Sequence, residues 1–440
     1  MLVLYYVTSI LVGTGLLHLP WASTGTPLSW LDALFTATSA QCVTGLAVVD
    51  TGQRLSLFGQ GVLLILIQTG GLGITTFSVY LFFYVRQRVG LRGRWFIQST
   101  LLHRPVDSLH ALIRSIFLMT LLIEGAGTAL LALRFVPEMG WGWGLYTALF
   151  HAISAFCNAG FSLFSDSLIR YRGDLLVNGT IMALIILGGI GFLVLDELWH
   201  HARERRQRRK LTLHTRLVLI TTLALILTGT LMILLLEQHA SLKGMGWGEG
   251  LLTSLFQSVT ARTAGFNTID LNRYEVPTLF WMMALMFIGA SPGSSGGGVK
   301  TTSLAVFFAV LGSRLRGHTH TSILRRNIPE ETATKALSLM MLAGLVLFFA
   351  ILLLLSVQLE GRAVLDSGHA FVDYTFEAVS AFGTVGLSLG ATARLTAGGK
   401  GIIIALMFIG RVGLLTLAFA ILYRARKNPV IYSEENIMIG

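Results

Sequence analysis

Charged residues are scarce in this sequence, and their scarcity already limits the class of protein. Asp, Glu, Lys and Arg make up 12% of the 440 residues, whereas 53% are hydrophobic. Soluble globular proteins carry about a quarter charged residues, so a soluble globular protein is excluded. Apolar runs of roughly 20 residues, enough to cross a hydrocarbon core of ~30 Å, occur eight times. They cover residues 2–19, 60–85, 111–135, 175–199, 213–236, 278–312, 335–358 and 399–423.

Cysteine is scarce as well. Cys42 and Cys157 are the only two in the chain, so no disulfide framework is implied. They take equivalent positions in the repeat described below, around a common axis. Their Cα atoms are therefore not expected to come within the ~7 Å that a disulfide needs, and we expect two free thiols.

The net charge of +11 is concentrated in four clusters of basic residues. Each cluster follows an even-numbered apolar run. The clusters are Arg86, Arg88, Arg92, Arg94, Arg104 and Arg114; Arg203, Arg205, Arg206, Arg208, Arg209, Lys210 and Arg216; Arg314, Arg316, Arg325, Arg326 and Lys335; and Arg424, Arg426 and Lys427. This is the distribution that the positive-inside rule requires of cytoplasmic loops. We predict a multi-pass protein of the cytoplasmic (inner) membrane with both termini cytoplasmic, whose partners include membrane lipid and no nucleic acid.

A short motif recurs four times between the apolar runs of each pair. Each copy ends in a glycine flanked by apolar or small residues, and the third copy is one residue shorter between its aromatic residue and this glycine. The copies are "LFTATSAQCVTGL" (34–46), "LFHAISAFCNAGF" (149–161), "LFQSVTARTAGF" (255–266) and "TFEAVSAFGTVGL" (375–387). About a dozen helical residues before each glycine are too few to span the membrane, so we predict re-entrant half-helices.

Four such half-helices around one axis would direct their C-terminal partial negative charges, about half an elementary charge each, at one point. A cation suits that point, and backbone carbonyls after the helices can replace its hydration shell. Glycine permits the backbone conformations that such a ring of carbonyls needs. The alternative is that these glycines only let membrane helices pack closely.

A second glycine-rich landmark lies in the second helix of each pair. We call these stretches the inner landmarks: "IQTGGLGITTF" (67–77), "IILGGIGFLVL" (185–195), "MFIGASPGSSGGG" (286–298) and "MFIGRVGLLTL" (407–417). For Gly70, Gly73, Gly188 and Gly191 close helix packing is the favoured interpretation. The sequence thus predicts an all-α membrane protein of four helix, pore-loop, helix repeats. Their ranges are 1–86, 108–205, 211–316 and 333–427, followed by a tail at 428–440.

At these motifs the chain resembles the Trk/Ktr/HKT potassium transporters, from residue 1 to the C-terminus, and within them most closely the Ktr membrane subunit. The resemblance implies one pore per subunit with a selectivity filter formed by Val43, Thr44, Gly45, Asn158, Ala159, Gly160, Thr263, Ala264, Gly265, Thr384, Val385 and Gly386. It implies K⁺ at the carbonyls of the four glycines; a single glycine per copy also leaves room for Na⁺.

The resemblance further implies a homodimer and a ring of cytoplasmic regulatory subunits that bind nucleotide. The C-terminal "VIYSEENIMIG" (430–440) is similar to a dimer-contacting segment of the family, although such an apolar end is equally typical of a frayed tail. The chain enters its first repeat at once, so we expect a cytoplasmic N-terminal tail to be absent or trimmed.

Residues 289–302, "GASPGSSGGGVKTT", interrupt the sixth apolar run. A phosphate-binding loop needs its lysine directly after the last glycine, but Val299 precedes Lys300. Pro292 breaks a helix, and the following glycines do not favour its resumption. The resemblance implies an intramembrane gate below the filter, whereas a passive kink is the alternative. The gate residues would be Gly289, Ser291, Pro292, Gly293, Ser294, Ser295, Gly296, Gly297 and Gly298.

Three basic residues lie near these features. Arg411 stands in the eighth run at the position of the inner-landmark glycine. Its guanidinium either hydrogen-bonds to carbonyls of the loop at 289–302 and holds it shut, or is a packing charge that pairs with other groups. Arg262 precedes the third filter segment and should point away from the axis, as filter support, paired with Glu377 or Glu124. Lys300 should lie near the cytoplasmic mouth, either solvated or facing the vestibule.

We predict gated K⁺ uptake by a protein that is not an enzyme and binds no cofactor covalently, with nucleotide only on the regulatory partner. The alternative is K⁺ symport coupled to Na⁺ or H⁺. Proton coupling favours carboxylates within the membrane, and Glu124 is the only clear mid-span candidate. A membrane nucleotide hydrolase would need a phosphate loop in a soluble domain, and no such domain fits here.

Overall fold

The computed structural model describes residues 2–88, 109–203, 210–318, 320–359 and 368–413, with side chains for residues 3–73, 113–202 and most of the later ranges. The tail at 428–440 and the basic residues Arg92, Arg94, Arg104, Arg205, Arg206, Arg208, Arg209, Arg424, Arg426 and Lys427 lie outside the described residues. Below, repeats 1 to 4 denote the four residue ranges expected from the sequence.

Nearly all regular structure in the described residues is helical, and one order of elements recurs. A long helix is followed by a short one of 12 to 16 residues, an extended segment and a second helix. Repeats 1 and 2 contain α1 (Leu2–His18), α2 (Trp30–Gln41), α3 (Thr51–Arg54), α4 (Leu57–Arg88), α6 (Leu109–Met139), α7 (Trp141–Phe156), α8 (Leu175–Gly189) and α9 (Phe192–Arg203). Repeats 3 and 4 contain α10 (Leu213–Glu237), α11 (Trp247–Thr260), α12 (Val276–Phe287), α13 (Thr301–Leu315), α14 (Glu330–Gln358), α16 (Ala370–Gly383) and α17 (Ala397–Val412).

Small elements complete the connections. One 3₁₀ turn lies in each repeat: η1 (Pro20–Ala22), η2 (Ile169–Tyr171), η3 (Leu271–Arg273) and η4 (Thr392–Arg394). Between α13 and α14 the chain forms an antiparallel hairpin of β1 (Ser322–Ile323) and β2 (Arg326–Asn327). Both hairpin-turn residues, Leu324 and Arg325, have positive φ, as a two-residue hairpin turn of the primed type requires.

Several helices are long and apolar enough to cross a membrane. Within the described residues these are Ile113–Met139, Leu213–Glu237 and Glu330–Gln358, and α8 with α9 forms a further candidate bent by 104°. Shorter apolar helices are Val3–His18, Leu57–Gly73, Val276–Phe287 and Thr301–Leu315. The run expected at 278–312 is divided into α12 and α13 by a loop, and the run at 399–423 extends past the described residues. Eight spans therefore remain a prediction.

The short helices α2, α7, α11 and α16 all begin beside an exposed aromatic side chain. Trp30, Trp141 and Trp247 are the first residues of their helices and are 63%, 81% and 78% exposed, and Phe371 near the start of α16 is 60% exposed. Aromatic side chains of this kind collect at the membrane–water interface. The N-termini of the short helices thus carry the kind of side chain that is common at membrane surfaces.

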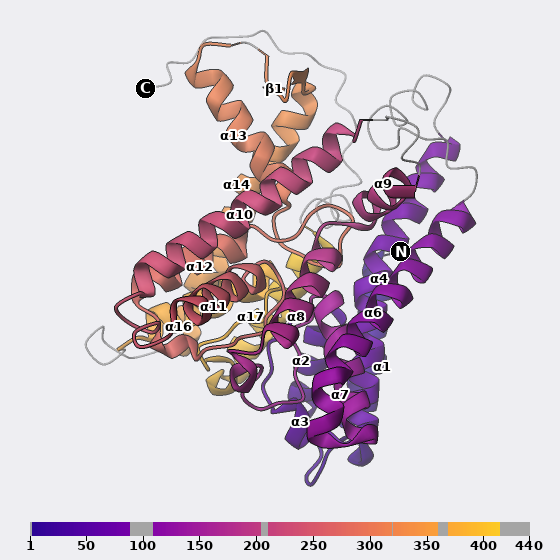
Figure 1. The fold of residues 1–440 in the computed structure, drawn as a ribbon, viewed down its shortest axis with the longest axis vertical. Helices are drawn as coiled ribbons and strands as arrows, with labels where there is room; N and C mark the ends of the chain where they lie inside the picture. Colours follow the sequence, from indigo (N-terminus) through magenta and orange to yellow (C-terminus); the bar gives the residue numbers. More distant parts are fainter. Residues whose placement is uncertain (1, 89–108, 204–209, 319, 360–367, 414–440) are drawn as a thin grey trace.

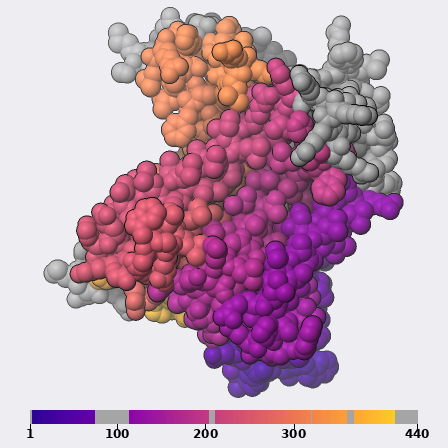
Figure 2. Space-filling model, in the orientation of Figure 1, coloured from indigo at the N-terminus to yellow at the C-terminus, as the bar shows by residue number. Residues whose placement is uncertain are grey.

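Repeats 1 and 2, indigo to magenta, pack together on one side of Figure 1, and repeats 3 and 4 pack together on the other. Two buried apolar clusters match this division: one is drawn mainly from repeats 1 and 2, and the other mainly from repeats 3 and 4. α13, the hairpin and the start of α14 project from this body, as the orange atoms in Figure 2 show. A small cluster of Val306, Val310, Ala333 and Ala336 holds this projection together.

Candidate ion-conducting site

The segments after the four short helices share one backbone conformation. In each, two residues with positive φ flank a central residue. The φ values are 55° at Val43 and 95° at Gly45, 59° at Asn158 and 68° at Gly160, 78° at Thr263 and 82° at Gly265, and 51° at Thr384 and 90° at Gly386. Positive φ is a genuine outlier for β-branched residues and costs about 1–3 kcal/mol at each. Four copies of one conformation, three of them strained at a β-branched residue, indicate a shared requirement.

The four segments also meet one another. A Cβ added to Gly45 would lie 3.1 Å from the Cα of Gly160, and one on Gly160 would lie 3.0 Å from that of Gly265. From Gly265 the corresponding distance is 3.3 Å to Gly386, and from Gly386 it is 3.0 Å back to Gly45. The contacts therefore close into a ring in sequence order. An L side chain at any of the four positions would be strained by its φ and would meet the next segment.

A hydroxyl near the end of each short helix secures its segment, a feature that the sequence reasoning missed. The amides of Gly45 and Gly386 donate to the Oγ atoms of Ser39 and Ser380, at 3.1 Å each. Ser154 Oγ donates to the Phe161 carbonyl at 2.8 Å, and Thr260 Oγ1 donates to that of Phe266 at 2.6 Å. The signal was present, because Ser or Thr followed by Ala occurs at the same place in all four motifs.

The deletion in the third motif falls between this hydroxyl and the glycine. In the other copies the amide five residues after the hydroxyl residue donates to its carbonyl, as from Thr44 to Ser39 at 2.8 Å. In the third copy Ala264 donates to the Thr260 carbonyl four residues back, at 3.0 Å. The turn absorbs the missing residue, so Thr263 and Gly265 keep the shared conformation.

Arg262 points away from the ring, but its expected partners are corrected by the structure. Arg262 is 7% exposed, and its Nη2 donates to Thr222 Oγ1 at 3.4 Å. Glu124 instead accepts from Gln68 at 3.2 Å, and Glu377 accepts from Thr392. Among the described residues neither carboxyl pairs with Arg262.

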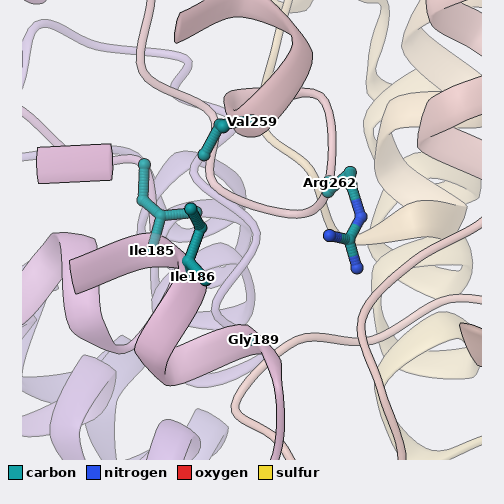
Figure 3. A pocket seen from close by; sticks show the side chains of 5 residues that line it. All are labelled: Ile185, Ile186, Gly189, Val259 and Arg262. Atoms are coloured by element: carbon teal, nitrogen blue, oxygen red, sulfur yellow. The ribbon is translucent and has the colours of Figure 1, made fainter. Parts of the chain in front are cut away.

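One feature favours a cation at Arg262 in the absence of the expected carboxylate. The residue follows the end of α11, whose partial negative charge favours a cation. Its side chain also lines a small cavity, together with Ile185, Ile186 and Gly189 of α8 and Val259 of α11 (Figure 3).

The loop between α12 and α13 lies directly against the ring. Gly297 donates through its amide to Thr384 Oγ1 at 2.9 Å, and a Cβ on Gly296 would clash with Thr263 Oγ1. Both threonines belong to the strained segments. The loop therefore occupies the space next to the third and fourth segments.

Other repeats hold the same loop in place through inner-landmark carbonyls. The amides of Ser291 and Ser295 donate to the carbonyls of Gly189 at 3.0 Å and Gly188 at 3.2 Å, and the Gly298 amide donates to that of Gly410 at 3.2 Å. Within the loop, Ser294 Oγ donates to the Ser291 carbonyl at 2.6 Å. Pro292 begins a turn, and Gly293 has a φ of 70°, a value open to glycine.

Arg411 lies buried against this loop, at 2% exposed. Its guanidinium donates to the carbonyl of Ser295 and, at 2.6 Å, to that of Gly70, while its Nε donates to Tyr6 Oη at 3.2 Å. All three acceptors are uncharged. Arg411 thus joins the loop to repeat 1, with which the loop shares no other hydrogen bond among the described residues.

Gly70 and Gly188 serve close packing, as expected. A Cβ on either would overlap the carbonyl at the end of the short helix in the same repeat, that of Gln41 or Phe156. Gly289 instead approaches the Gly297 carbonyl within its own loop, and its neighbour Ala290 donates through its amide to that carbonyl at 3.3 Å. Cys42 and Cys157 are buried free thiols, as predicted.

Ion pairs join neighbouring repeats at the surface marked by the aromatic residues. Lys400 of α17 contacts Asp32 in the first turn of α2 at 2.6 Å, and Arg172 contacts Glu249 in the first turn of α11 at 2.7 Å. Burial raises the pKa of Asp32, but hydrogen bonds from Lys400 and Ser29 outweigh it and hold this pKa below its ordinary value. These pairs join repeat 4 to repeat 1 and repeat 2 to repeat 3.

Residues 5–428 match the profile of the TrkH family, described as a cation transport protein. The chain belongs to this family. Over its full length it is 41% identical to the Ktr system potassium uptake protein B of Vibrio alginolyticus, covering 94% of that protein. Over 99% of its length it is 40% identical to the protein of the same name from Bacillus subtilis, covering 95% of it. These matches confirm the resemblance that the sequence shows. They also confirm the prediction that the chain is a transporter and not an enzyme.

Two further relatives extend the comparison. Over 98% of its length the chain is 35% identical to the potassium/sodium uptake protein NtpJ of Enterococcus hirae, covering 94% of it. The crystal structure of the potassium transporter TrkH from Vibrio parahaemolyticus superposes with a TM-score of 0.73, at 18% identity, over 95% of this chain and 83% of that one. At that identity the likeness concerns the fold alone.

Proposed function

We propose that this chain takes up K⁺ through a pore whose filter is formed by residues 43–45, 158–160, 263–265 and 384–386, one segment from each of four pore repeats. The single observation that carries the proposal is the closed ring of four positive-φ glycines. Such a backbone suits the presentation of carbonyl oxygens, which replace the water around an alkali ion. The potassium uptake proteins of V. alginolyticus and B. subtilis, at 41% and 40% identity, support K⁺ as the ion.

The loop at 289–298 acts as the gate in this proposal, with Arg411 as its latch. Two observations support it: the loop lies against Thr263 and Thr384 of the filter, and inner-landmark carbonyls of repeats 2 and 4 hold it there. Arg262 then supports the filter from behind, with Glu124 and Glu377 buried behind other segments.

The experiment compares ion flux in proteoliposomes containing the full chain and a variant lacking Gly293 to Gly298. We expect ⁸⁶Rb⁺ entry into vesicles with the full chain to exceed ²²Na⁺ entry, and the deletion to raise flux sharply. Equal flux with and without the deletion would overturn the gate, and absence of ⁸⁶Rb⁺ entry from both would overturn the pore. No nucleotide hydrolysis by the purified chain is expected.

A second candidate is K⁺ symport coupled to Na⁺ or H⁺. It is favoured by the name of the potassium/sodium uptake protein NtpJ at 35% identity and by Glu124, a buried carboxyl in a spanning helix. The same vesicles separate the candidates: a pH or Na⁺ gradient alone drives ⁸⁶Rb⁺ accumulation only if transport is coupled.

The proposal places the chain in the cytoplasmic membrane with both termini inside. The basic residues Arg314, Arg316, Arg325 and Arg326 on the projecting α13 and hairpin fit the positive-inside rule. We further propose a homodimer and a nucleotide-binding cytoplasmic partner, since the word "system" in the relatives' names points to a further component. Co-purification with and without such a partner tests this part.

A further inference from the structure

Two of the basic side chains near the ring and its loop are well supplied with acceptors. Arg411 donates to three oxygen atoms, two of them backbone carbonyls. Lys300 is half-buried, and its Nζ donates to the carbonyls of Gly296 at 2.7 Å and Gly297 at 3.3 Å. The solvated placement of Lys300 considered from the sequence is therefore wrong. In both cases the negative ends of peptide dipoles compensate the charge.

Arg262 is the exception. It is 7% exposed, yet its buried Nε has no hydrogen-bond partner among the described residues. Its Nη2 donates to Thr222 Oγ1 at 3.4 Å, which is longer than the ~2.7–3.2 Å of an ordinary N–H···O bond. A guanidinium carries several N–H donors and does not lose its proton in proteins. Arg262 therefore retains both its charge and donors that are not used.

The charge of Arg262 lies in an unfavourable place for a ring that binds cations. Thr263, the first residue of the third ring segment, follows it directly in the chain, and like charges repel strongly where the dielectric constant is low. The end of α11 offers only about half an elementary negative charge. None of the ion pairs among the described residues includes Arg262. A full negative charge beside Arg262 would stabilise both the guanidinium and a cation in the ring.

The cavity that Arg262 lines suits one small anion. It offers about as much room as a single water molecule needs. Its other lining residues are Ile185, Ile186, Gly189 and Val259 (Figure 3). Because none of these side chains is polar, an oxyanion such as phosphate or sulfate would be too large and would lack donors for its oxygens. A halide is monatomic and has a low charge density, and the unused N–H groups of the guanidinium are charged donors for it.

We propose that the cavity beside Arg262 binds one chloride ion, whose charge offsets the guanidinium behind the third ring segment. The chloride accepts hydrogen bonds from the guanidinium and packs against the methyl groups of the isoleucine and valine side chains. The binding site stands independently of transport. Only the effect of its charge on cation binding in the ring rests on the proposed function.

The first test measures thermal unfolding of the purified full chain in detergent, at constant K⁺ concentration and ionic strength. Chloride replaces gluconate, an anion too large for the cavity. We expect the unfolding temperature to rise and to saturate, by about 1–3 °C at roughly ten times the dissociation constant. Arg262→Met keeps most of the side-chain length without the charge and should lose this rise. Arg394→Met, which changes an exposed arginine paired with Asp373, should retain it.

An equal rise in Arg262→Met and in the wild type, or no rise in the wild type, would overturn the site. If Arg262→Met does not fold, crystals of the wild type grown in bromide give the answer. Anomalous density within hydrogen-bond distance of the Arg262 guanidinium would support the site, and a bromide-free cavity would overturn it.

The second test measures the ⁸⁶Rb⁺ concentration at half-maximal uptake in proteoliposomes, with chloride or gluconate on both sides of the membrane. For the wild type we expect this concentration to be on the order of threefold lower in chloride, and for Arg262→Met we expect it to be the same in both anions. Halide binding without any such change would overturn the electrostatic role and leave the site in place. Absence of ⁸⁶Rb⁺ uptake in either anion would instead contradict the proposed filter, on which the unfolding measurement does not depend.

Discussion

The filter segments and the inner landmarks belong to the same four repeats, but the first are alike in all four and the second differ in all four. At the proposed filter, each repeat contributes the same positive-φ backbone and the same glycine. At the inner landmarks, α4 continues unbroken in repeat 1 and α8 bends by 104° into α9 in repeat 2. Repeat 3 opens into the loop of residues 289–298, and repeat 4 carries the buried Arg411.

The difference indicates what each level needs. If the ring surrounds one ion, as proposed, it requires equal ligands from every side, and its four parts are constrained alike. A single loop that lies against the ring is supplied by repeat 3 and is bonded by the inner landmarks of repeats 2 and 4, so the four inner landmarks cannot all be alike. Substitutions at the two levels should therefore have opposite effects on flux.

The largest effect is expected from alanine at the filter glycines. Gly45→Ala, Gly160→Ala, Gly265→Ala and Gly386→Ala each place a Cβ at positive φ against the next segment, adding about 1–2 kcal/mol of backbone strain before the clash. We expect each to abolish ⁸⁶Rb⁺ uptake. Gly179→Ala is the control, since a Cβ there meets nothing within 4 Å. Normal ⁸⁶Rb⁺ uptake by any one of these four variants would show that the four glycines are not equivalent.

Arg411→Ala should raise flux rather than abolish it. The substitution removes a buried cation that donates to Ser295, Gly70 and Tyr6, and a bond from a charged donor contributes about 1.5–3 kcal/mol. Flux on the order of tenfold or more above wild type is expected from loss of one such bond in the closed state. Arg394→Ala, which removes an exposed arginine paired with Asp373, should leave flux unchanged. Untouched uptake in Arg411→Ala would end the latch proposal.

A smaller effect should follow from Ser39→Ala or Ser380→Ala. Each leaves a filter glycine amide without its acceptor, a loss of about 1 kcal/mol. We expect uptake to persist with a reduced ratio of ⁸⁶Rb⁺ to ²²Na⁺ entry, measured in the same vesicles. Ser356→Ala provides the comparison, because among the described residues that hydroxyl bonds only to the Leu353 carbonyl, within α14 itself. An unchanged ratio in both variants would show that the hydroxyls do not shape the filter.

The smallest effect concerns the pair of Asp32 and Lys400 between repeats 1 and 4. Asp32→Asn should cost up to about 1 kcal/mol of stability at neutral pH, since the pair is partly solvated. The pKa of Asp32 is lower in the folded state, so this contribution is present at neutral pH and is lost as the pH falls through that lowered pKa. Thermal unfolding in detergent should show a difference from wild type at pH 7 that shrinks in acid. A difference independent of pH would contradict this assignment.

The features that could be predicted from the sequence are those that repeat locally. The positions of the four ring glycines, the break between α12 and α13 and the packing role of Gly70 and Gly188 all follow from local motifs in the sequence. Thr222 as the partner of Arg262 did not, because it lies 40 residues away on α10. The bond from Arg411 to Gly70 joins residues 341 apart, a contact that depends on how the repeats assemble. The Ser or Thr near the end of each short helix recurs in all four motifs, but its hydrogen bond to the following segment could not be predicted from the motif alone.

The exposed aromatic residues at the starts of the short helices have a consequence for how the protein responds to its bilayer. Tryptophan side chains at the membrane–water interface fix the depth of the segment that carries them. A mismatch between protein and bilayer thickness is then accommodated by tilt of other helices or by local deformation of the bilayer. Trp30, Trp141 and Trp247 are each one short helix away from the filter. A change in bilayer thickness would therefore leave the filter at a fixed distance from one membrane surface and displace the opposite end of the long helices instead.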